Sequence, residues 1–340
     1  MDGEIRIALD AMGGDNMPSA PVRGAVKAVE SGEGFRVILV GREREIRGEL
    51  DRTGYTGNRI DIRPASEVIE MAEPPVAAIR SKTDSSIVVG LGLVRSGEAD
   101  AFVSAGSTGA VIAGAQVIVG RIRGIRRSPL AVLIPTESGV SLLIDCGANV
   151  DARPDQLVQF ARMGSVYMEN VLGIKEPSVG IVNIGAEDEK GNALVKDTLP
   201  LLRKEKGIRF VGSVEARDIP AGGTDVLVTE AFVGNVVLKM LEGTASMFKR
   251  MLKKNLTASL SGKIGGLLIK PSVRKMMSAF DASKHGGAPI LGLKGLVVKT
   301  HGNSGPEEIA AAIRQCTVFY AQKVNEKIAE AILAESGDNS

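Results

Sequence analysis

The feature that most constrains the fold is a repeated pattern in which a short apolar run ends at a glycine-rich or polar turn and helical spacing follows. Apolar runs over residues 5–10, 36–41 and 99–104 all continue in this way. Alternation of strand and helix at this spacing predicts right-handed β–α–β units and a mainly parallel sheet. Ligands of such sheets bind beyond the carboxyl ends of the strands, so the residues that follow each strand are the candidates for ligand binding.

Later segments continue the pattern except at a predicted hairpin and at a long helical region. Further strands are predicted over 179–185, 208–214 and 225–229. The segments 130–135 and 139–144 are separated by three turn residues and predict a hairpin that breaks the rhythm. The region from 236 to 280 is almost wholly helical in pattern, 289–300 is extended, and a closing helix is predicted over 306–334.

The whole chain excludes several classes of function. A formal net charge of +2 and an aromatic content of 3% provide neither a polyanion-attracting field nor stacking platforms, so we expect no nucleic-acid partner. Two cysteines are too few for a disulfide framework or a structural zinc site, and each is expected to be a buried small apolar residue. No uninterrupted apolar stretch of about 18 residues is present. We therefore expect a cytoplasmic protein with one α/β domain over 1–340.

The sharpest local motif lies between a predicted strand and a predicted helix, at residues 104–109. Backbone N–H groups, hydroxyl donors and the positive end of a helix together favour an anion site. Capping of the helix by Ser107 or Thr108 explains the same residues equally well. The motif is neither a Walker loop nor a dinucleotide-binding loop. The candidate phosphate-binding residues here are Ser104, Gly106, Ser107, Thr108 and Gly109.

Four other positions carry candidate chemistry, each with a plainer alternative. Arg80 can clamp phosphate in bidentate geometry, although a solvated charged face is the commoner explanation. Lys190 can reach an oxyanion from a loop whose acids otherwise read as helix caps. Asn235 follows a strand end and can orient a carbonyl group. His301, beside Lys299 and Gly302, can act as an acid or hydrogen-bond donor, or it can be structural.

Other catalytic machinery is not supported. No Ser/His/Asp order is defensible, since serine is abundant and both histidines lie late in the chain, and no cluster has metal-ligand spacing. Direct attack by phosphate on a carbonyl requires neither, because it depends on neutralised phosphate charge, placement and fixed oxyanion donors. We expect no cofactor.

A basic and apolar helical excursion is predicted over 242–282. Between residues 242 and 275 there are eight basic residues, and Glu242 is the only acid. Such a segment suits an anionic membrane or an acidic protein, and packing in a dimer explains it equally well. Three glycines (Gly262, Gly265 and Gly266) argue against one rigid helix. The candidate docking residues are Arg250, Lys253, Lys254, Leu256, Leu260, Lys263, Ile264 and Leu267.

The sequence resembles the PlsX-type phosphate acyltransferases of bacterial phospholipid synthesis over nearly its full length. The matching motifs occur in the same order, at residues 8–15, 104–110, 145–151, 163–167, 190–192, 214–218, 232–236, 286–289 and 299–302. The resemblance implies a three-layer Rossmann-like α/β/α fold related to phosphotransacetylases and to isocitrate or isopropylmalate dehydrogenases. It also implies a homodimer in peripheral contact with the inner face of the cell membrane.

The resemblance further implies a reaction in which acyl-[acyl carrier protein] and phosphate give acyl phosphate and free carrier protein. A glycerol-3-phosphate acyltransferase would receive the product, and the acidic carrier protein is a second candidate partner for the basic excursion. In this scheme Lys190, Asn235 and His301 are the expected catalytic residues. Replacing Lys190 or His301 by Ala is expected to cut turnover at least about a hundredfold.

The chain departs from the family pattern at four places. Ser107 replaces a common Asn, and Glu230-Ala231 replaces a common Asp-Gly beside Asn235. Ala282 and His285 stand where tyrosines are common, so neither tyrosine can be essential here. The alternatives that remain are a phosphotransacetylase that uses short acyl-coenzyme A, a membrane-bound scaffold and, without a cofactor-binding motif, a dehydrogenase.

Overall fold

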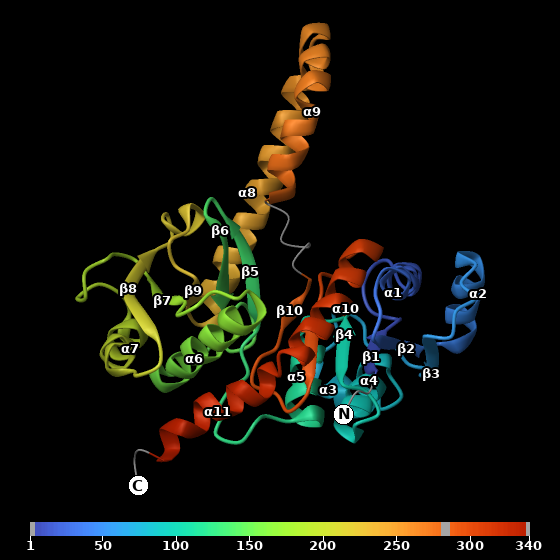
Figure 1. The fold of residues 1–340 in the computed structure, drawn as a ribbon, viewed down its shortest axis with the longest axis horizontal. Helices are drawn as coiled ribbons and strands as arrows, with labels where there is room; N and C mark the ends of the chain where they lie inside the picture. The colour runs from blue at the N-terminus through green and yellow to red at the C-terminus, as the bar shows by residue number, and fades with distance from the viewer. Residues whose placement is uncertain (1–3, 280–285, 338–340) are drawn as a thin grey trace.

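The computed structural model describes residues 4–279 and 286–337 and contains two sheets side by side (Figure 1). The first has the order β10-β11-β4-β1-β2-β3, with only β10 antiparallel to its neighbour. Its strands are β1 Ile5–Asp10, β2 Phe35–Gly41, β3 Ile60–Pro64, β4 Ala101–Ser104, β10 Ala288–Pro289 and β11 Leu296–Lys299. The predicted mostly parallel α/β fold is confirmed.

The second sheet is built from one continuous part of the chain, in the order β5-β6-β9-β7-β8. Its strands are β5 Ala131–Thr136, β6 Gly139–Ile144, β7 Ser178–Asn183, β8 Arg209–Glu215 and β9 Val226–Val228. β5 and β6 pair antiparallel from Ala131–Ile144 to Thr136–Gly139, as predicted for the hairpin, and the other pairings are parallel. Both sheets bury near-continuous apolar strands, which is expected when helices cover a parallel sheet.

Helices cover the sheets on both sides. Around the first sheet they are α1 Ser19–Ser31, α2 Glu43–Thr53, α3 Pro75–Ser81, α4 Ser86–Ser96, α5 Thr108–Gly114 with a π-helical continuation Ala115–Val119, and α10 Pro306–Ala321. Around the second they are α6 Pro154–Val171, α7 Ala193–Lys204 and a short 3₁₀ turn Ile219–Ala221. Gly24 lets α1 approach α10 closely, because an added Cβ would lie 2.6 Å from Ile309 Cβ.

The C-terminal end differs from the single closing helix that the sequence predicted. The chain forms α10 and then α11, Val324–Gly337, with a break at Gln322 and Lys323. Lys323 has φ 51°, a left-handed conformation that a continuous helix does not contain. The break turns α11 away so that it packs against α6 of the second sheet.

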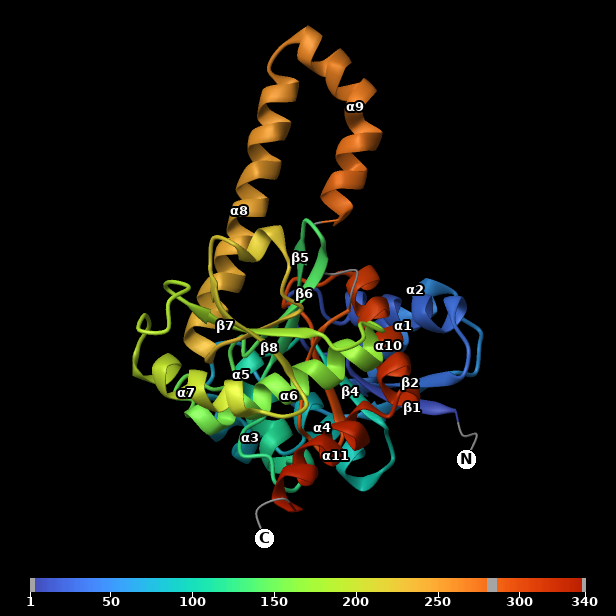
Figure 2. The same ribbon diagram turned by 60° about the vertical axis from the view of Figure 1, so that its left-hand side comes forward.

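Two long helices project from the body as a hairpin, as Figure 2 shows. They are α8 Ala231–Thr257 and α9 Leu260–Ala279. The stretch is therefore not one rigid helix, as the sequence predicted, although the break falls at 258–259 and Gly262, Gly265 and Gly266 lie inside α9. No helix in the described ranges is long and apolar enough to cross a membrane. Large apolar side chains are nevertheless exposed on the hairpin, at Met240, Met247, Phe248, Met251, Ile264, Leu267, Leu268 and Ile269.

Candidate active site

Three neighbouring strands of the first sheet end in buried polar side chains. Asp10 ends β1, Ser104 ends β4 and Lys299 ends β11, with Lys299 directly opposite Ser104. Ser104 Oγ donates to Asp10 Oδ2 at 2.7 Å and accepts from the Gly106 N–H at 3.0 Å. Since parallel strands end at the same edge, the three strands bring these groups into one buried cluster.

Lys299 is the electrostatic centre of this cluster. Burial lowers its pKa to about 8, against the raising effect of Asp10, and nearby Lys239 lowers it further. Burial also raises the pKa of Asp10, although hydrogen bonds from Ser86 and Ser104 oppose the shift. The Lys299 ammonium donates to the Thr300 carbonyl oxygen. An ammonium has three donors. Lys299 is therefore equipped to bind an anion below about pH 8.

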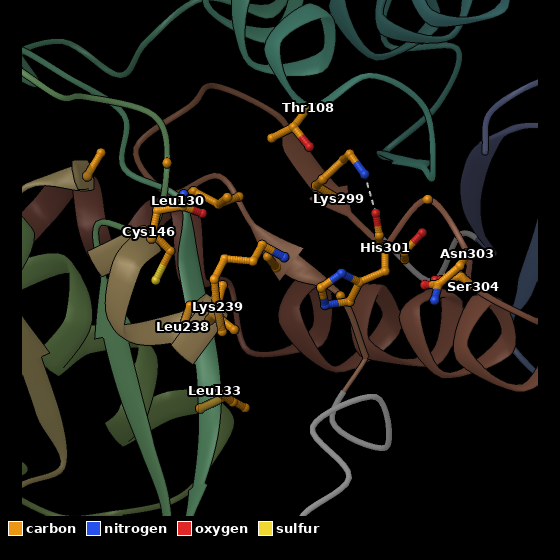
Figure 3. Close-up of a pocket in the computed structure, with 18 of the residues that line it drawn as sticks. Thr108, Leu130, Leu133, Cys146, Leu238, Lys239, Lys299, His301, Asn303 and Ser304 are labelled. Atoms are coloured by element: carbon orange, nitrogen blue, oxygen red, sulfur yellow. Dashed lines mark hydrogen bonds between the residues drawn. The ribbon is translucent and has the colours of Figure 1, made fainter. Parts of the chain in front are cut away.

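A cavity of about 670 Å³ opens beside Lys299, between the first sheet, the second sheet and the start of α8 (Figure 3). Thr108 and Lys299 lie close together on one side of it, with His301, Asn303 and Ser304 near the loop after β11. The opposite side carries the apolar residues Leu130, Leu133, Cys146 and Leu238 (Figure 3), and the lining also includes Val132, Val150, Ala231 and Phe232. Asn235 and Lys239 add polar groups from α8. The cavity thus combines a cationic wall with an apolar one.

His301 lies on the loop that follows β11. Its Nε2 atom is 3.3 Å from Glu242 Oε1, and Glu242 Oε2 accepts from Lys239 Nζ at 2.8 Å. Burial lowers the pKa of His301, Glu242 opposes this shift, and Lys239 and Lys299 reinforce it. A pKa below the usual 6.5 leaves the imidazole neutral near pH 7, the form that can accept a proton.

The apolar wall of the cavity is held in place by Asp145, the residue that follows β6. Its buried carboxylate accepts hydrogen bonds from the backbone N–H groups of Leu130, Gly147, Ala148 and Asn149 and from the Asn149 side chain. Burial raises the pKa of Asp145, and these hydrogen bonds oppose the shift. This network ties the loop after β6 to the beginning of β5, so it fixes the part of the wall around Cys146 and Leu130.

Gly234 lets α8 begin directly against this loop, because an added Cβ would lie 1.8 Å from the Asp145 carbonyl oxygen. We expect Gly234→Ala to lower the free energy of unfolding by about 1–3 kcal/mol, measured by urea unfolding. Gly243→Ala on the same helix is the matched control, since nothing lies within 4 Å of its added Cβ. The control should be neutral or stabilising by up to about 1 kcal/mol. Equal stability in the two variants would contradict this close approach.

The structure brings together only part of the predicted phosphate site. Thr108 lines the cavity. Ser104 and Gly106 lie in the buried cluster with Asp10, and Ser107 caps α5 by accepting from the Ala110 N–H at 3.5 Å. Gly109 packs against Pro75 of α3, with 2.5 Å from an added Cβ to Pro75 Cγ. Arg80 is exposed on α3 and is not among the lining residues.

The predicted catalytic residues are placed in two regions. Asn235 and His301 both line the cavity. Lys190 lies in the loop between β7 and α7, where its side chain is exposed. Its Nζ atom is 3.7 Å from Glu187 Oε2. It does not line the cavity. A catalytic role for Lys190 stays a prediction.

Sequence reasoning did not assign Lys299, Lys239 or Glu242 to the site. Lys299 stands near the end of the predicted extended segment 289–300, and this position is the sequence signal that could have identified it. Lys239 follows Asn235 by four residues, which puts both on one face of a helix. His285 and Ala282 lie outside the described residues. Both cysteines are buried, as expected, and no group of three or more His, Cys, Asp or Glu within 4–279 and 286–337 could hold a metal ion.

A family model described as "Fatty acid synthesis protein" matches residues 5–327. The chain belongs to this family. It is 49% identical over 322 residues to a phosphate acyltransferase of Clostridium botulinum, covering 95% of this chain and 96% of the relative. A phosphate acyltransferase of Clostridium acetobutylicum is 46% identical, with 95% and 97% covered. The resemblance to the PlsX-type phosphate acyltransferases is confirmed.

A solved structure gives the same result for the fold. The phosphotransacetylase of Streptococcus pyogenes superposes with a TM-score of 0.64 and 18% identity, covering 95% of this chain and 94% of that one. At this identity the likeness concerns the fold alone. It agrees with the predicted relation to phosphotransacetylases.

Proposed function

We propose that this family member is an acyltransferase that moves an acyl group from the thioester of an acyl carrier protein to inorganic phosphate. The products are acyl phosphate and free carrier protein, and they supply phospholipid synthesis. The observation that carries the proposal is the cavity, in which buried Lys299 faces an apolar wall. The ammonium suits a phosphate, and the apolar wall suits an acyl chain with its thioester. The names of the relatives support the same reaction.

Each wall suggests roles for its residues. Lys299 and Thr108 bind the phosphate, and Ser104 supports Lys299 from the buried cluster through Asp10. The other residues of the 104–109 turn shape this wall, with Ser107 capping α5. Asn235 orients the thioester carbonyl from α8, and His301 handles the proton that moves from phosphate to the leaving thiolate.

The reaction can be tested with purified protein, a long-chain acyl carrier protein, phosphate and hydroxylamine to trap acyl phosphate. We expect phosphate-dependent hydroxamate in amounts equal to the free carrier protein released. Release without hydroxamate would indicate a thioesterase instead. No release from an intact donor would point to a short acyl-coenzyme A donor or to a scaffold, which liposome binding without turnover would support.

Two alanine variants test the predicted catalytic residues. His301→Ala should lower turnover at least about a hundredfold, the scale of losing an acid–base group. Lys190→Ala should do the same if the loop between β7 and α7 reaches the substrate, from this chain or from a second copy. An unchanged rate in either variant, in the hydroxamate assay, removes that residue from the mechanism.

The helical hairpin is proposed as the docking surface for partners. Arg250, Lys253 and Lys254 are exposed on α8, and Lys263, Ile264 and Leu267 on α9, whereas Leu256 packs against Gly266. The side chain of Leu260 lies outside the described part. A cationic and apolar surface suits an acidic carrier protein, and the same surface suits a peripheral contact with an anionic membrane.

Carrier-protein docking predicts a salt effect. The Lys253→Glu/Lys254→Glu double variant should lose at least about tenfold in kcat/KM for the acyl carrier protein at low ionic strength, and less as salt is raised. An acyl thioester without carrier protein is the control donor, and its rate should be unchanged. Equal losses with both donors would show damage to the cavity and contradict docking at these lysines.

We also propose that residues 1–340 act as one domain and as a homodimer, with the hairpin at 242–282 as an excursion. The packing of α11 against α6 supports the single domain, because it joins the two sheets. A glycerol-3-phosphate acyltransferase is the proposed recipient of the acyl phosphate.

A further inference from the structure

Glu242 lies on the face of α8 that lines the cavity, and one of its carboxylate oxygens lacks a hydrogen-bond partner among the residues described. Asn235, Leu238 and Lys239 line the cavity, and Glu242 follows Lys239 by three residues on the same helical face. Lys239 Nζ donates a hydrogen bond to the Oε2 atom of Glu242 at 2.8 Å. The other carboxylate oxygen of Glu242, Oε1, is buried and has no hydrogen-bond partner among the residues described. A buried carboxylate oxygen without a donor is unfavourable, so this atom calls for a partner.

The partner at hand is His301. Its Nε2 atom lies 3.3 Å from Glu242 Oε1, within ion-pair distance, so an Nε2–H group is the nearest donor of the right kind for this oxygen. No hydrogen bond to His301 Nδ1 is present in the described ranges, and His301 itself lines the cavity. One ring nitrogen therefore has a carboxylate beside it, and the other is open to the site.

We propose that Glu242 is a positioning residue that keeps the proton of neutral His301 on Nε2 and leaves Nδ1 as the proton acceptor in the cavity. The inference rests on the proposed function and specifies how its proton moves. Glu242 belongs to α8 and His301 to the loop after β11, so this contact joins the two walls of the cavity.

The proton balance of the reaction agrees with this arrangement. As an oxygen of HPO₄²⁻ attacks the thioester carbonyl, the Nδ1 lone pair takes the phosphate proton. The tetrahedral intermediate then collapses, the carbon–sulfur bond breaks, and Nδ1–H protonates the leaving thiolate. Thioester and HPO₄²⁻ give acyl phosphate and thiol with no proton gained or lost. The Glu242 carboxylate stabilises the imidazolium that exists between the two transfers.

The charged groups around His301 come from three elements. Lys239 and Glu242 lie on α8, Lys299 lies on β11 and Glu308 lies on α10. The two lysines lower the pKa of His301, and the two glutamates raise it. Removing the Glu242 charge must therefore lower the His301 pKa further, which extends activity to lower pH while weakening the base.

The first test measures the histidine itself and needs no acyl transfer. The chain contains two histidines, so ¹⁵N-histidine NMR spectra can be assigned by comparison with His301→Ala. We expect the wild-type His301 to show the Nε2–H tautomer when neutral. Its pKa should fall by about half a unit or more in Glu242→Gln. An Nδ1–H tautomer, or an unchanged pKa in a folded variant, would overturn the proposal.

The second test uses turnover. Glu242→Gln should lower kcat at least about tenfold, leave KM for phosphate within about threefold, and shift the acidic limb of the pH profile to lower pH. In a His301→Ala background the same change should cost less than about twofold, because Glu242 acts through His301. Glu307→Gln, an exposed glutamate paired with Lys27, is the control and should match wild type.

The outcomes separate the two proposals. A full tenfold loss in the His301→Ala background would mean that Glu242 acts independently of His301, and the inference fails while the reaction stands. Wild-type protein without hydroxamate would defeat the proposed function, and the NMR tautomer would still decide the contact. If Glu242→Gln does not fold, the tautomer of the wild-type protein decides.

Discussion

Replacement of Lys299 by Met should lower turnover with phosphate by about a hundredfold to a thousandfold, the range found when a preorganised charge-stabilising group is removed. The reason is the position of Lys299, which is the buried cation at the end of β11 and lies beside Thr108 on the cationic wall. Met keeps an unbranched side chain that is only one atom shorter than that of Lys, and it removes the charge. The hydroxamate assay at varied phosphate measures the effect, which we expect mainly in kcat/KM for phosphate.

The pH dependence supplies an independent check. Since the pKa of Lys299 is lowered to about 8 from 10.5, the ammonium is present below that pH and is lost above it. In wild type, kcat/KM for phosphate should therefore fall up to tenfold per unit above about pH 8. This limb should disappear in Lys299→Met.

The matched control for Lys299→Met is Lys294→Met, which changes an exposed lysine of the same segment at a distance from the cavity. Its rate should equal that of wild type. A Lys299→Met enzyme with more than about a third of wild-type kcat/KM would place phosphate elsewhere in the molecule.

Asp145→Ala should lower the free energy of unfolding by about 2–4 kcal/mol, because several buried donors lose their acceptor at once. Four backbone N–H groups and the Asn149 amide point at this carboxylate. Urea unfolding followed by circular dichroism measures the change. Asp151→Ala, in the same loop and exposed, is the control and should stay within about 0.5 kcal/mol of wild type.

The contrary outcome for Asp145 is also informative. If the two variants were equally stable, water would have to replace the carboxylate within the loop after β6. Turnover of Asp145→Ala, measured well below its unfolding temperature, should fall as well, because the loop that holds Leu130 and Cys146 forms one wall of the cavity.

The parts of the fold that could be predicted are those set by local chemistry. Apolar runs that end at polar or Gly-rich turns predicted most of the strands, and the three turn residues at 136–138 predicted the β5–β6 hairpin. β3 was not predicted, and the extended segment expected over 289–300 is divided into β10 and β11. The division into two sheets was not visible, because strand order depends on pairing between distant segments. The break at Lys323 was also missed, since helical spacing continues through it and the contact of α11 with α6 is a tertiary one.

The same distinction applies to the candidate site. Thr108, Asn235 and His301 could be predicted to line it, because each follows a strand end or opens a helix. The central place of Lys299 in the site could not be predicted. Its lowered pKa arises from burial beside a strand that lies almost 200 residues away in sequence. Ser104 was predicted as a candidate phosphate-binding residue from its turn, and only the tertiary structure shows that its hydroxyl donates a hydrogen bond to Asp10.

The order of strands in the first sheet has a consequence for the growing polypeptide. Every strand of the second sheet lies between residues 131 and 228, so that sheet can assemble as soon as this part leaves the ribosome. β4 instead remains an open edge until β11 is made, and Ser104 and Thr300 are 196 residues apart. At about 5–20 residues per second, that edge is unpaired for roughly 10–40 s. The lysine that completes the cavity arrives with the strand that closes the edge, so a nascent chain exposes an aggregation-prone strand before it has an active site.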